Sequence, residues 1–301
     1  DEGIGALHQM LLDKKNYMGI VGGDGACLGC GEKTVVHLFV ATAEALMQPR
    51  VARQIAKIDE LIARLDQHTR LKLAATLDLS DEDRVASALD NLKNHDVTLA
   101  SFSEKLDERH AGKTIDPDWL RWVSQLIAKL KHLRWQYTDG AGRRGRSAMG
   151  IINSTGCTSV WASTYPFNPY PFPWTNHLFQ DSPSMAMGIF EGHMARMAEG
   201  FAAIRMAEIE LDGGYRKEKH GEFFTYFNWK QFTEEEFHLC PPVVSIGGDG
   251  AMYDIGFQNL SRMMMSGKPI KVLVLDTQVY SNTGGQACTS GFTGQVSDMA
   301  Q

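Results

Sequence analysis

The apolar residues near the C-terminus form two strand-length runs with a helical segment between them. The run at residues 243–246 predicts one strand, and the run at 270–275 predicts another. Residues 255–265 predict a helix, which Gly267 and Pro269 would end. A strand, a helix and a strand in this order predict a βαβ unit. The fold class is therefore α/β, with a parallel sheet flanked by helices.

Similar patterns predict elements elsewhere in the chain. A strand is expected at residues 149–153, and a long helix rich in Ala and Met at 184–211. Nearer the N-terminus, a short helix is expected at 4–12 and a strand at 17–21. Four prolines within residues 160–181 exclude a helix there, because proline lacks an amide hydrogen, and predict an ordered loop rich in aromatic residues.

The segment from residue 44 to residue 146 shows only helical patterns. Apolar residues recur at helical spacing within 55–65. A Ser cap and an acidic first turn predict a helix at 80–92, and an Asp-Pro-Asp start predicts one at 119–135. We therefore predict two domains: residues 1–43 with 147–301, and a mainly helical insertion at 44–146.

The end of this helical insertion is rich in basic residues. They could dock an acidic partner or the phosphates of coenzyme A, although a solvated surface is the simpler interpretation. The residues concerned are Lys129, Lys131, Arg134, Arg143, Arg144 and Arg146.

Glycine and polar residues follow both strands of the predicted βαβ unit. Gly248-Asp249-Gly250 follows the first strand, and Asp276-Thr277 follows the second. Open parallel sheets bind ligands at the carboxyl ends of their strands. The glycines allow close approach of a diphosphate, and Asp249 is a hard oxygen ligand suited to Mg²⁺. Thr277 and the carbonyl group of Val279 can complete a site for a metal ion and a diphosphate.

Composition restricts the class of protein. Hydrophobic residues at 43% and charged residues at 22% are typical of a soluble globular protein. The longest apolar runs are too short to span a membrane, and a net charge of −6 argues against broad nucleic-acid binding. Five cysteines favour a reduced, cytoplasmic setting. A start without Met and an end with no finishing element lead us to expect a piece of a longer polypeptide.

The cysteines are the second candidate site. Cys27 and Cys30 form a C-x-x-C pair, and Cys157 follows the predicted strand at 149–153. Such a pair fits zinc, an iron–sulfur cluster or a redox disulfide, and the neighbouring glycines favour a cluster. Cys288 is interpreted as a free thiol, and Cys240 as a small buried apolar residue.

Together these motifs resemble one enzyme family. I-G-G-D-G at 246–250 followed by D-T-x-V-Y-S-N-T-G-G-Q at 276–286 resembles the C-terminal thiamine-diphosphate domain of the pyruvate:ferredoxin oxidoreductases, which are 2-oxoacid:ferredoxin oxidoreductases. C-x-G-C-G-E at 27–32 and T-G-C-T-S-V-W at 155–161 are similar to motifs of the same family. N-x-L-F-x-D at 176–181 resembles a motif that follows the family's active-site loop.

The resemblance implies thiamine diphosphate, Mg²⁺ and a [4Fe-4S] cluster as cofactors. It implies Asp249, Thr277 and the Val279 carbonyl as magnesium ligands. The cluster ligands would be Cys27, Cys30 and Cys157, with a fourth outside this chain. The cofactor contacts it implies are Glu32, Gly248, Asp249, Gly250, Ala251, Thr277, Val279 and Asn282.

The implied reaction is the oxidative decarboxylation of a 2-oxoacid, first of all pyruvate, to an acyl-CoA. Electrons would pass through the cluster to ferredoxin or flavodoxin, and Asn282 would contact the substrate. In this family a separate N-terminal domain supplies the carboxylate that faces the aminopyrimidine ring. We therefore expect this chain to need the remaining domains of the same enzyme, to be inactive alone, and to act within a homodimer.

Three alternatives remain open at this point. The chain could come from a non-redox thiamine-diphosphate enzyme, such as a decarboxylase or an acetolactate-type synthase, although the cysteines argue against this. It could also come from a 2-oxoglutarate-specific homologue or be a non-catalytic fragment. Two features of the sequence need a separate interpretation. The connection between Cys30 and Cys157 is longer than the family usually has, and a second G-G-D-G at 22–25 is interpreted as a loop because no partner for Asp24 follows.

Overall fold

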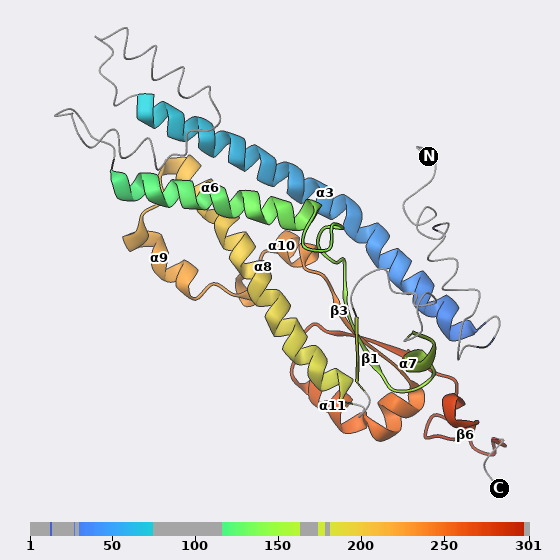
Figure 1. Cartoon of the computed structure of the whole chain (residues 1–301). Coiled ribbons are helices and arrows are strands. Elements are labelled where there is room, and N and C mark those ends of the chain that lie inside the picture. The colour runs from blue at the N-terminus through green and yellow to red at the C-terminus, as the bar shows by residue number, and fades with distance from the viewer. Residues whose placement is uncertain are drawn as a thin grey trace, which may run out of the picture. The chain divides into compact units, whose positions relative to one another are not determined.

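The computed structural model describes residues 13, 27, 30–74, 116–162, 174–177 and 181–297 (Figure 1). The chain divides into two compact units. The first unit consists of residues 1–51, 147–197 and 232–301, and the second consists of 52–146 and 198–231. The two domains expected from the sequence, with limits at residues 43 and 147, stay a prediction.

A parallel sheet of four strands forms the centre of the first unit. Its order is β2 (Trp174–His177), β1 (Gly150–Ser154), β3 (Val243–Gly248) and β4 (Lys271–Leu275). All neighbouring strands run parallel. The predicted α/β class with a parallel sheet flanked by helices is confirmed. The predicted strands near β1, β3 and β4 are found with ends shifted by one or two residues.

Strand β2 corrects the prediction of an ordered loop across residues 160–181. Trp174–His177 pairs with β1, so that Asn176 lies beside Asn153. Helix α7 (Cys157–Ala162) also extends into the first three residues of this segment, where no helix was expected. The four prolines lie outside the described residues.

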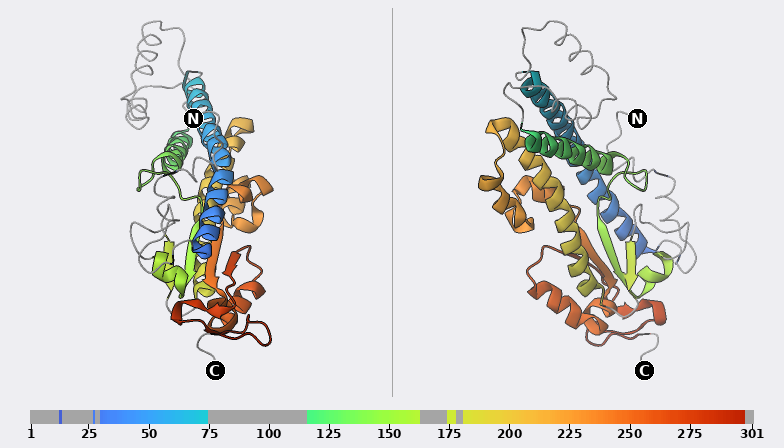
Figure 2. Two further views of the ribbon diagram at one scale, coloured as in Figure 1. Left: turned by 90° about the vertical axis from the view of Figure 1, so that its right-hand side faces the viewer. Right: turned by 60° about the vertical axis from the view of Figure 1, so that its left-hand side comes forward.

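Helices cover both faces of this sheet. The first part of α3 (Gly31–Ala74) and α7 pack on one face, and the start of α8 (Ser182–Gly213) lies on the other (Figures 1 and 2). An added Cβ at Gly150 would meet the His193 ring of α8 at 3.3 Å, which shows how closely this helix approaches β1. The apolar core on the α3 face contains Val36, Val40, Met149, Ile151, Trp161, Ala162, Val244, Ile246 and Leu275.

Helix α3 is continuous from Gly31 and contains the predicted stripe at 55–65, of which Ile58, Leu61 and Leu65 are buried. It contains Pro49, two residues before the first unit ends at Val51. The helix therefore belongs to both units, and no break in it marks the predicted start of the insertion.

The second unit contains the rest of α3, α6 (Pro117–Thr138), the end of α8, and α9 (Lys217–Thr225). The helix predicted at 119–135 is confirmed as α6: the Asp116 side chain accepts a hydrogen bond from the Asp118 amide, and Pro117 occupies its first turn. Its apolar face is buried and consists of Leu120, Val123, Leu126, Ile127, Leu130, Leu133 and Tyr137.

A buried carboxylate connects the helices of this unit. Glu210 of α8 is 1% exposed. Its Oε1 contacts Lys72 Nζ at 2.9 Å, Trp119 Nε1 at 2.9 Å and His68 Nε2 at 3.1 Å, and its Oε2 accepts from the Tyr215 amide at 2.8 Å. Burial opposes ionisation, but these hydrogen bonds outweigh it and lower the pKa of Glu210. Glu210 is therefore an ionised anchor shared by α3, α6 and α8.

The remaining elements connect α8 to the sheet or follow it. They are η1 (Trp229–Gln231), α10 (Glu234–Leu239), the π-helical turn η2 (Gly250–Ile255), α11 (Phe257–Met265), β5 (Val279–Tyr280), η3 (Ser281–Thr283) and β6 (Gln286–Ala287). The helix predicted at 255–265 begins at Phe257, because η2 and Gly256 come first.

Some predicted elements lie outside the described residues. They are the helices at 4–12 and 80–92, the strand at 17–21 and the G-G-D-G loop at 22–25. Of the basic residues, Arg134 pairs with Asp59, and Arg146 donates to Gln136 Oε1 at 3.1 Å. Among the described residues, no helix is long and apolar enough to cross a membrane.

Candidate functional site

A pocket of about 130 Å³ lies at the carboxyl edge of the sheet, where β3 and β4 end. It brings together nine residues that were predicted from separate parts of the sequence: Glu32, Cys157, Gly248, Asp249, Gly250, Ala251, Thr277, Val279 and Asn282. Six further lining residues were not predicted: Thr155, Gly156, Ile255, Tyr280, Ser281 and Thr283. The sequence motifs on α3, α7, β3 and β4 thus meet at one place.

Oxygen atoms converge in this pocket around Thr277. Its Oγ1 lies 3.3 Å from Asp249 Oδ1, 3.0 Å from the Val279 carbonyl oxygen and 2.6 Å from Ser281 Oγ. A hydroxyl group has one hydrogen, so Thr277 cannot donate to both Asp249 and Val279. One pair of oxygens is left facing without a hydrogen between them. A hard cation ligated by these oxygens would satisfy them, so the donor set fits Mg²⁺.

Asp249 is held as an ionised carboxylate. It is 2% exposed, and its Oδ2 accepts from Ser290 Oγ and, at 3.3 Å, from Cys288 Sγ. Burial opposes ionisation, but hydrogen bonds from Ser290, Cys288 and the Gly250 amide outweigh it and lower the pKa of Asp249. Oδ2 is thus occupied by protein donors, whereas Oδ1 faces Thr277. Sequence reasoning missed both donors, because they lie on the loop after β6.

A residue with a strained backbone, Gln278, determines the conformation of the loop after β4. Gln278 has φ of 62°, which non-glycine residues rarely adopt, and its amide donates to Asp276 Oδ1 at 3.2 Å. This turn brings the Thr277 hydroxyl and the Val279 carbonyl within hydrogen-bonding distance of each other. Such strain is typical of ligand sites, where the surrounding structure maintains it. The β5–β6 hairpin follows, with Val279 beside Ala287.

Gly250 is required because Tyr280 packs directly against it. A Cβ at position 250 would lie 2.4 Å from Tyr280 Cε1. The Tyr280 hydroxyl donates to Asp254 Oδ2 at 2.6 Å, so the ring is anchored. Burial and this carboxylate raise the pKa of Tyr280 to about 12, so the hydroxyl keeps its hydrogen at neutral pH. Gly250 therefore leaves room for the Tyr280 ring, which forms part of the pocket wall.

Replacing Gly250 with alanine is expected to lower the free energy of unfolding by about 1–3 kcal/mol, because the added methyl group overlaps the anchored Tyr280 ring. Chemical denaturation would measure this. Gly192→Ala is the matched control, since an added Cβ in α8 meets nothing within 4 Å and should be neutral or stabilising. Combining Gly250→Ala with Tyr280→Ala should remove the overlap. An additive double variant would contradict the explanation.

Glu32 reaches the pocket from the first turn of α3. Its Oε2 is buried and has no hydrogen-bond partner among the described residues. Burial raises the pKa of Glu32; the Trp161 side chain opposes the rise, and the charge of Asp249 adds to it. A buried oxygen without a partner, on the wall of a pocket, fits a ligand that donates a hydrogen bond.

The predicted cluster cysteines are neighbours in space. The Cys30 amide donates to the Cys27 carbonyl at 3.2 Å, and Cys157 begins α7. Burial raises the pKa of the Cys157 thiol to about 11, with further contributions from Glu32, Cys30 and Cys27. Within the described ranges, no group of three or more His, Cys, Asp or Glu side chains is arranged to hold a single metal ion. Their role as cluster ligands stays a prediction.

The other two cysteines, Cys240 and Cys288, form no disulfide in the described part of the chain. Cys240 is buried, as predicted for a small apolar residue. Cys288 is a free thiol, as predicted. It also donates a hydrogen bond to Asp249, which lines the pocket.

Comparison with known proteins explains why these motifs converge. Residues 237–300 match the family model described as the C-terminal TPP binding domain of thiamine pyrophosphate enzymes, thiamine pyrophosphate being thiamine diphosphate. The chain is 29% identical to pyruvate-flavodoxin oxidoreductase of Enterobacter agglomerans and 30% identical to pyruvate:ferredoxin oxidoreductase of Moorella thermoacetica, in each case over 50% of the chain. The chain is a relative of these pyruvate oxidoreductases. The family resemblance predicted from the motifs is thereby confirmed.

The similarity extends beyond the thiamine-pyrophosphate-binding segment. A Synechocystis protein that is provisionally named a pyruvate-flavodoxin oxidoreductase aligns with 87% of the chain at 26% identity. The chain spans 22% of that relative's length and 16% of the length of the Enterobacter and Moorella oxidoreductases. The matched part therefore corresponds to one region of a much longer enzyme.

Proposed function

We propose that this chain is the thiamine-diphosphate-binding part of an enzyme that oxidatively decarboxylates a 2-oxoacid, first of all pyruvate. The overall reaction would convert the 2-oxoacid, coenzyme A and an oxidised carrier into an acyl-CoA, CO₂ and the reduced carrier. The observation that carries the proposal is the meeting of Asp249, Thr277 and the Val279 carbonyl in one pocket. The names of the related enzymes support the choice of reaction.

Asp249 Oδ1, Thr277 Oγ1 and the Val279 carbonyl oxygen would hold Mg²⁺, which in turn holds the diphosphate. Gly248 leaves its backbone open, since an added Cβ would have only the Leu275 carbonyl oxygen, at 3.9 Å, within 4 Å. When bound, thiamine diphosphate supplies the nucleophilic carbon needed to cleave the bond between the carboxylate and the keto carbon of a 2-oxoacid. The protein binds and orients that cofactor.

Two further residues are proposed to act at the reacting end of the pocket. Asn282 lies on η3 and lines the pocket, so its amide would hydrogen-bond the substrate. The buried Glu32 Oε2 would accept a hydrogen bond from the cofactor. Ala251, buried at the start of η2, would shape the wall between them and the diphosphate.

We also propose that Cys27, Cys30 and Cys157 ligate a [4Fe-4S] cluster, with a fourth ligand outside this chain. The support is that Cys30 and Cys27 lie near enough to contribute to the raised pKa of Cys157, and that Cys157 lines the pocket. Thiolates are the ligands that iron–sulfur clusters use. The cluster would carry electrons to ferredoxin or flavodoxin, and the full enzyme would act as a homodimer.

The cofactor proposal can be tested by calorimetry with the 301-residue chain. Thiamine diphosphate should bind when Mg²⁺ is present and lose most of its affinity when EDTA removes the metal. Thiamine, which lacks the diphosphate, should bind far more weakly under both conditions. Equal binding of the two compounds, or binding that ignores Mg²⁺, would contradict the proposed site.

The cluster proposal has a separate test. After anaerobic reconstitution with iron and sulfide, the chain should gain a broad visible absorbance band and bound iron. Cys157→Ser should lower both, whereas Cys240→Ser, a buried cysteine that does not line the pocket at the carboxyl edge of the sheet, should leave them unchanged. Equal iron content in both variants would contradict the assignment of Cys157 as a cluster ligand.

Replacing Ser290 with alanine is expected to weaken Mg²⁺-dependent binding of thiamine diphosphate about tenfold, because the Asp249 carboxylate loses a donor that orients it. Ser290→Thr keeps the hydroxyl and should retain most of the affinity. Ser266→Ala, which removes a hydroxyl bonded to the Met263 carbonyl at the end of α11, is a control outside the pocket. Titration calorimetry would compare them, and an unchanged affinity in Ser290→Ala would contradict the role.

A further inference from the structure

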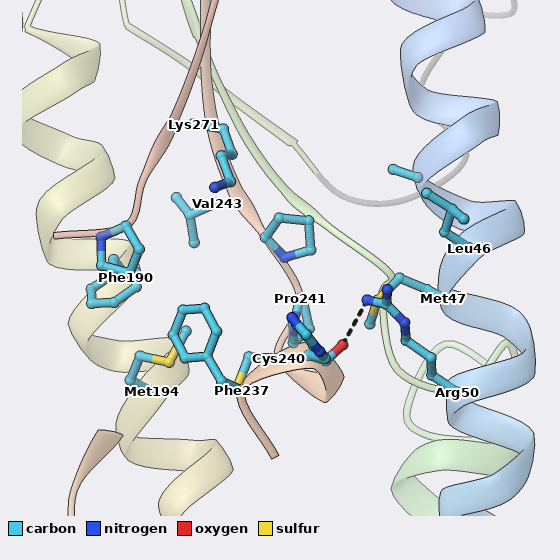
Figure 3. Close-up of a pocket in the computed structure, with 14 residues that line it drawn as sticks. Leu46, Met47, Arg50, Phe190, Met194, Phe237, Cys240, Pro241, Val243 and Lys271 are labelled. Carbon is cyan, nitrogen blue, oxygen red and sulfur yellow. Dashed lines mark hydrogen bonds between the residues drawn. The ribbon is translucent and has the colours of Figure 1, made fainter. Parts of the chain in front are cut away.

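A second pocket lies at the opposite edge of the sheet. It has a volume of about 290 Å³ and is bounded by α3, α8, α10 and the first residues of β3 and β4. In Figure 3, Val243 and Lys271 mark the starts of these strands, and Phe190 and Met194 approach from α8. The cofactor pocket lies beyond the other ends of the same strands. The two pockets share no lining residue.

The walls of this second pocket are mainly apolar. Aromatic rings come from Phe190 and Phe237, and flexible thioethers come from Met47 and Met194. Phe190 and Met194 are buried. Methionine and aromatic side chains adapt to irregular apolar groups, so the walls favour a compact apolar or aromatic body.

The charged groups that line this pocket are all of one sign. Arg50 and Lys271 are cationic, His238 is the other titratable side chain besides Cys240, and no carboxylate lines the pocket. This contrasts with the net charge of −6 for the chain. Among the described residues, Glu191 on the neighbouring turn of α8 is already paired with Lys268. The pocket therefore has positive charge that no acidic lining residue neutralises.

The two cations differ in how much of their bonding capacity is used. Arg50 donates one hydrogen bond to the His238 carbonyl oxygen at 3.0 Å, shown dashed in Figure 3, which fixes its position at the rim. The Lys271 ammonium makes no hydrogen bond or ion pair with the described residues, and Figure 3 shows its side chain extending beside Val243. An anionic group beside Lys271 would meet an ammonium group with unused hydrogen-bonding capacity, while an apolar group filled the interior.

We propose that this pocket is a binding site for a small carboxylate with a compact apolar or aromatic body. The carboxylate would contact Lys271, and the apolar body would contact Phe190, Phe237 and the two methionines. This site is independent of the thiamine-diphosphate pocket and of the reaction proposed for it. Its volume is at the small end for ligand sites, which limits the ligand to a single ring or a short branched chain.

Phenylbutyrate is a suitable probe, with phenylbutanol and phenylbutylamine as matched neutral and cationic analogues. In the chain labelled with ¹³C at the methionine methyl groups, phenylbutyrate should shift the Met47 and Met194 resonances. The Met252 resonance, buried beneath Gly247 at the other end of β3, should not move. Phenylbutanol should bind at least about tenfold more weakly, because it lacks the charge-assisted contacts, and phenylbutylamine should not bind.

Variants test the contribution of the Lys271 charge and that of the apolar cavity separately. Lys271→Met keeps a long side chain without the charge and should raise the Kd of phenylbutyrate about tenfold. Lys129→Met, on an exposed position of α6, should leave it unchanged. Met194→Trp should fill the pocket and abolish binding; if that variant does not fold, Leu46→Glu adds a negative charge at an exposed lining position instead. Equal affinity of the acid, alcohol and amine, or no shift at Met47 and Met194, would overturn the proposal.

Discussion

Replacing Asp249 with asparagine is expected to lower the affinity for thiamine diphosphate in the presence of Mg²⁺ by about 100-fold or more. The substitution keeps the shape of the side chain but removes the charge that a hard divalent cation requires. Loss of an orienting contact alone costs about 10–100-fold in metal affinity, so loss of a ligand should exceed that range. Titration calorimetry at a fixed Mg²⁺ concentration would measure the change.

Asp254→Asn is the matched control for this substitution. Asp254 is a nearby carboxylate that accepts from the Tyr280 hydroxyl at 2.6 Å and from the Thr289 amide, but it does not line the cofactor pocket. Its replacement should change the affinity far less. If both variants lose affinity equally, the effect comes from lost negative charge in general, and Asp249 has no special role. An unchanged unfolding curve for Asp249→Asn would show that the pocket itself is intact.

Replacing Glu210 with glutamine is expected to lower the free energy of unfolding of the second unit by about 3 kcal/mol. The carboxylate is buried and receives hydrogen bonds from α3, α6 and the Tyr215 amide, and removing one member of such a network leaves the Lys72 charge without its partner. Urea unfolding followed by the fluorescence of Trp119, which donates to Glu210, would report the change. Glu208→Gln is the control, because Glu208 is half exposed and pairs with Lys57 at the surface. It should cost less than about 1 kcal/mol.

The contribution of Glu210 should also depend on pH. Hydrogen bonding lowers its pKa in the folded chain below the ordinary value of 4.5. Its stabilisation is therefore fully present above about pH 4.5 and is lost as the pH falls through the lowered pKa. The difference in unfolding free energy between the wild type and Glu210→Gln should shrink below about pH 4.5. His68 and Lys72 are the basic side chains that face the carboxylate. A difference that stays constant down to pH 3 would contradict this account.

The cofactor pocket was predictable because its chemistry is local to the ends of strands. Gly248-Asp249-Gly250 and Asp276-Thr277 each follow an apolar run, and parallel strands place their carboxyl ends at one edge. Chain order alone therefore brings Asp249 near Thr277, which the 3.3 Å contact between their oxygens bears out. The approach of Glu32 and Cys157 to the same pocket followed from the family resemblance and not from spacing.

Other features could not be read from the sequence because their partners are far apart in the chain. Ser290 and Cys288 hold Asp249 only because the loop after β6 returns to the end of β3. Strand β2 has too few residues for a clear alternation, so only its pairing with β1 reveals it. The glycine-rich stretch at 246–250 also hides which glycines are sterically required. A Cβ at Gly250 would lie 2.4 Å from the Tyr280 ring, and a Cβ at Gly247 would lie 2.9 Å from Ser154 Cβ and Met252 Cε.

The sequence by itself determined the fold class, the position of the proposed metal-binding motif and the similarity to the pyruvate oxidoreductases, because each depends on residues close together in the chain. The tertiary structure alone decided how Asp249 is oriented, how Glu210 joins α3, α6 and α8, and that Arg50 and Lys271 line the same apolar pocket. The physical reason is that hydrogen bonds, charge and cavity shape depend on distances in space. Hydrophobic periodicity specifies which elements form and which of their faces are buried, but not which side chains come within bonding distance.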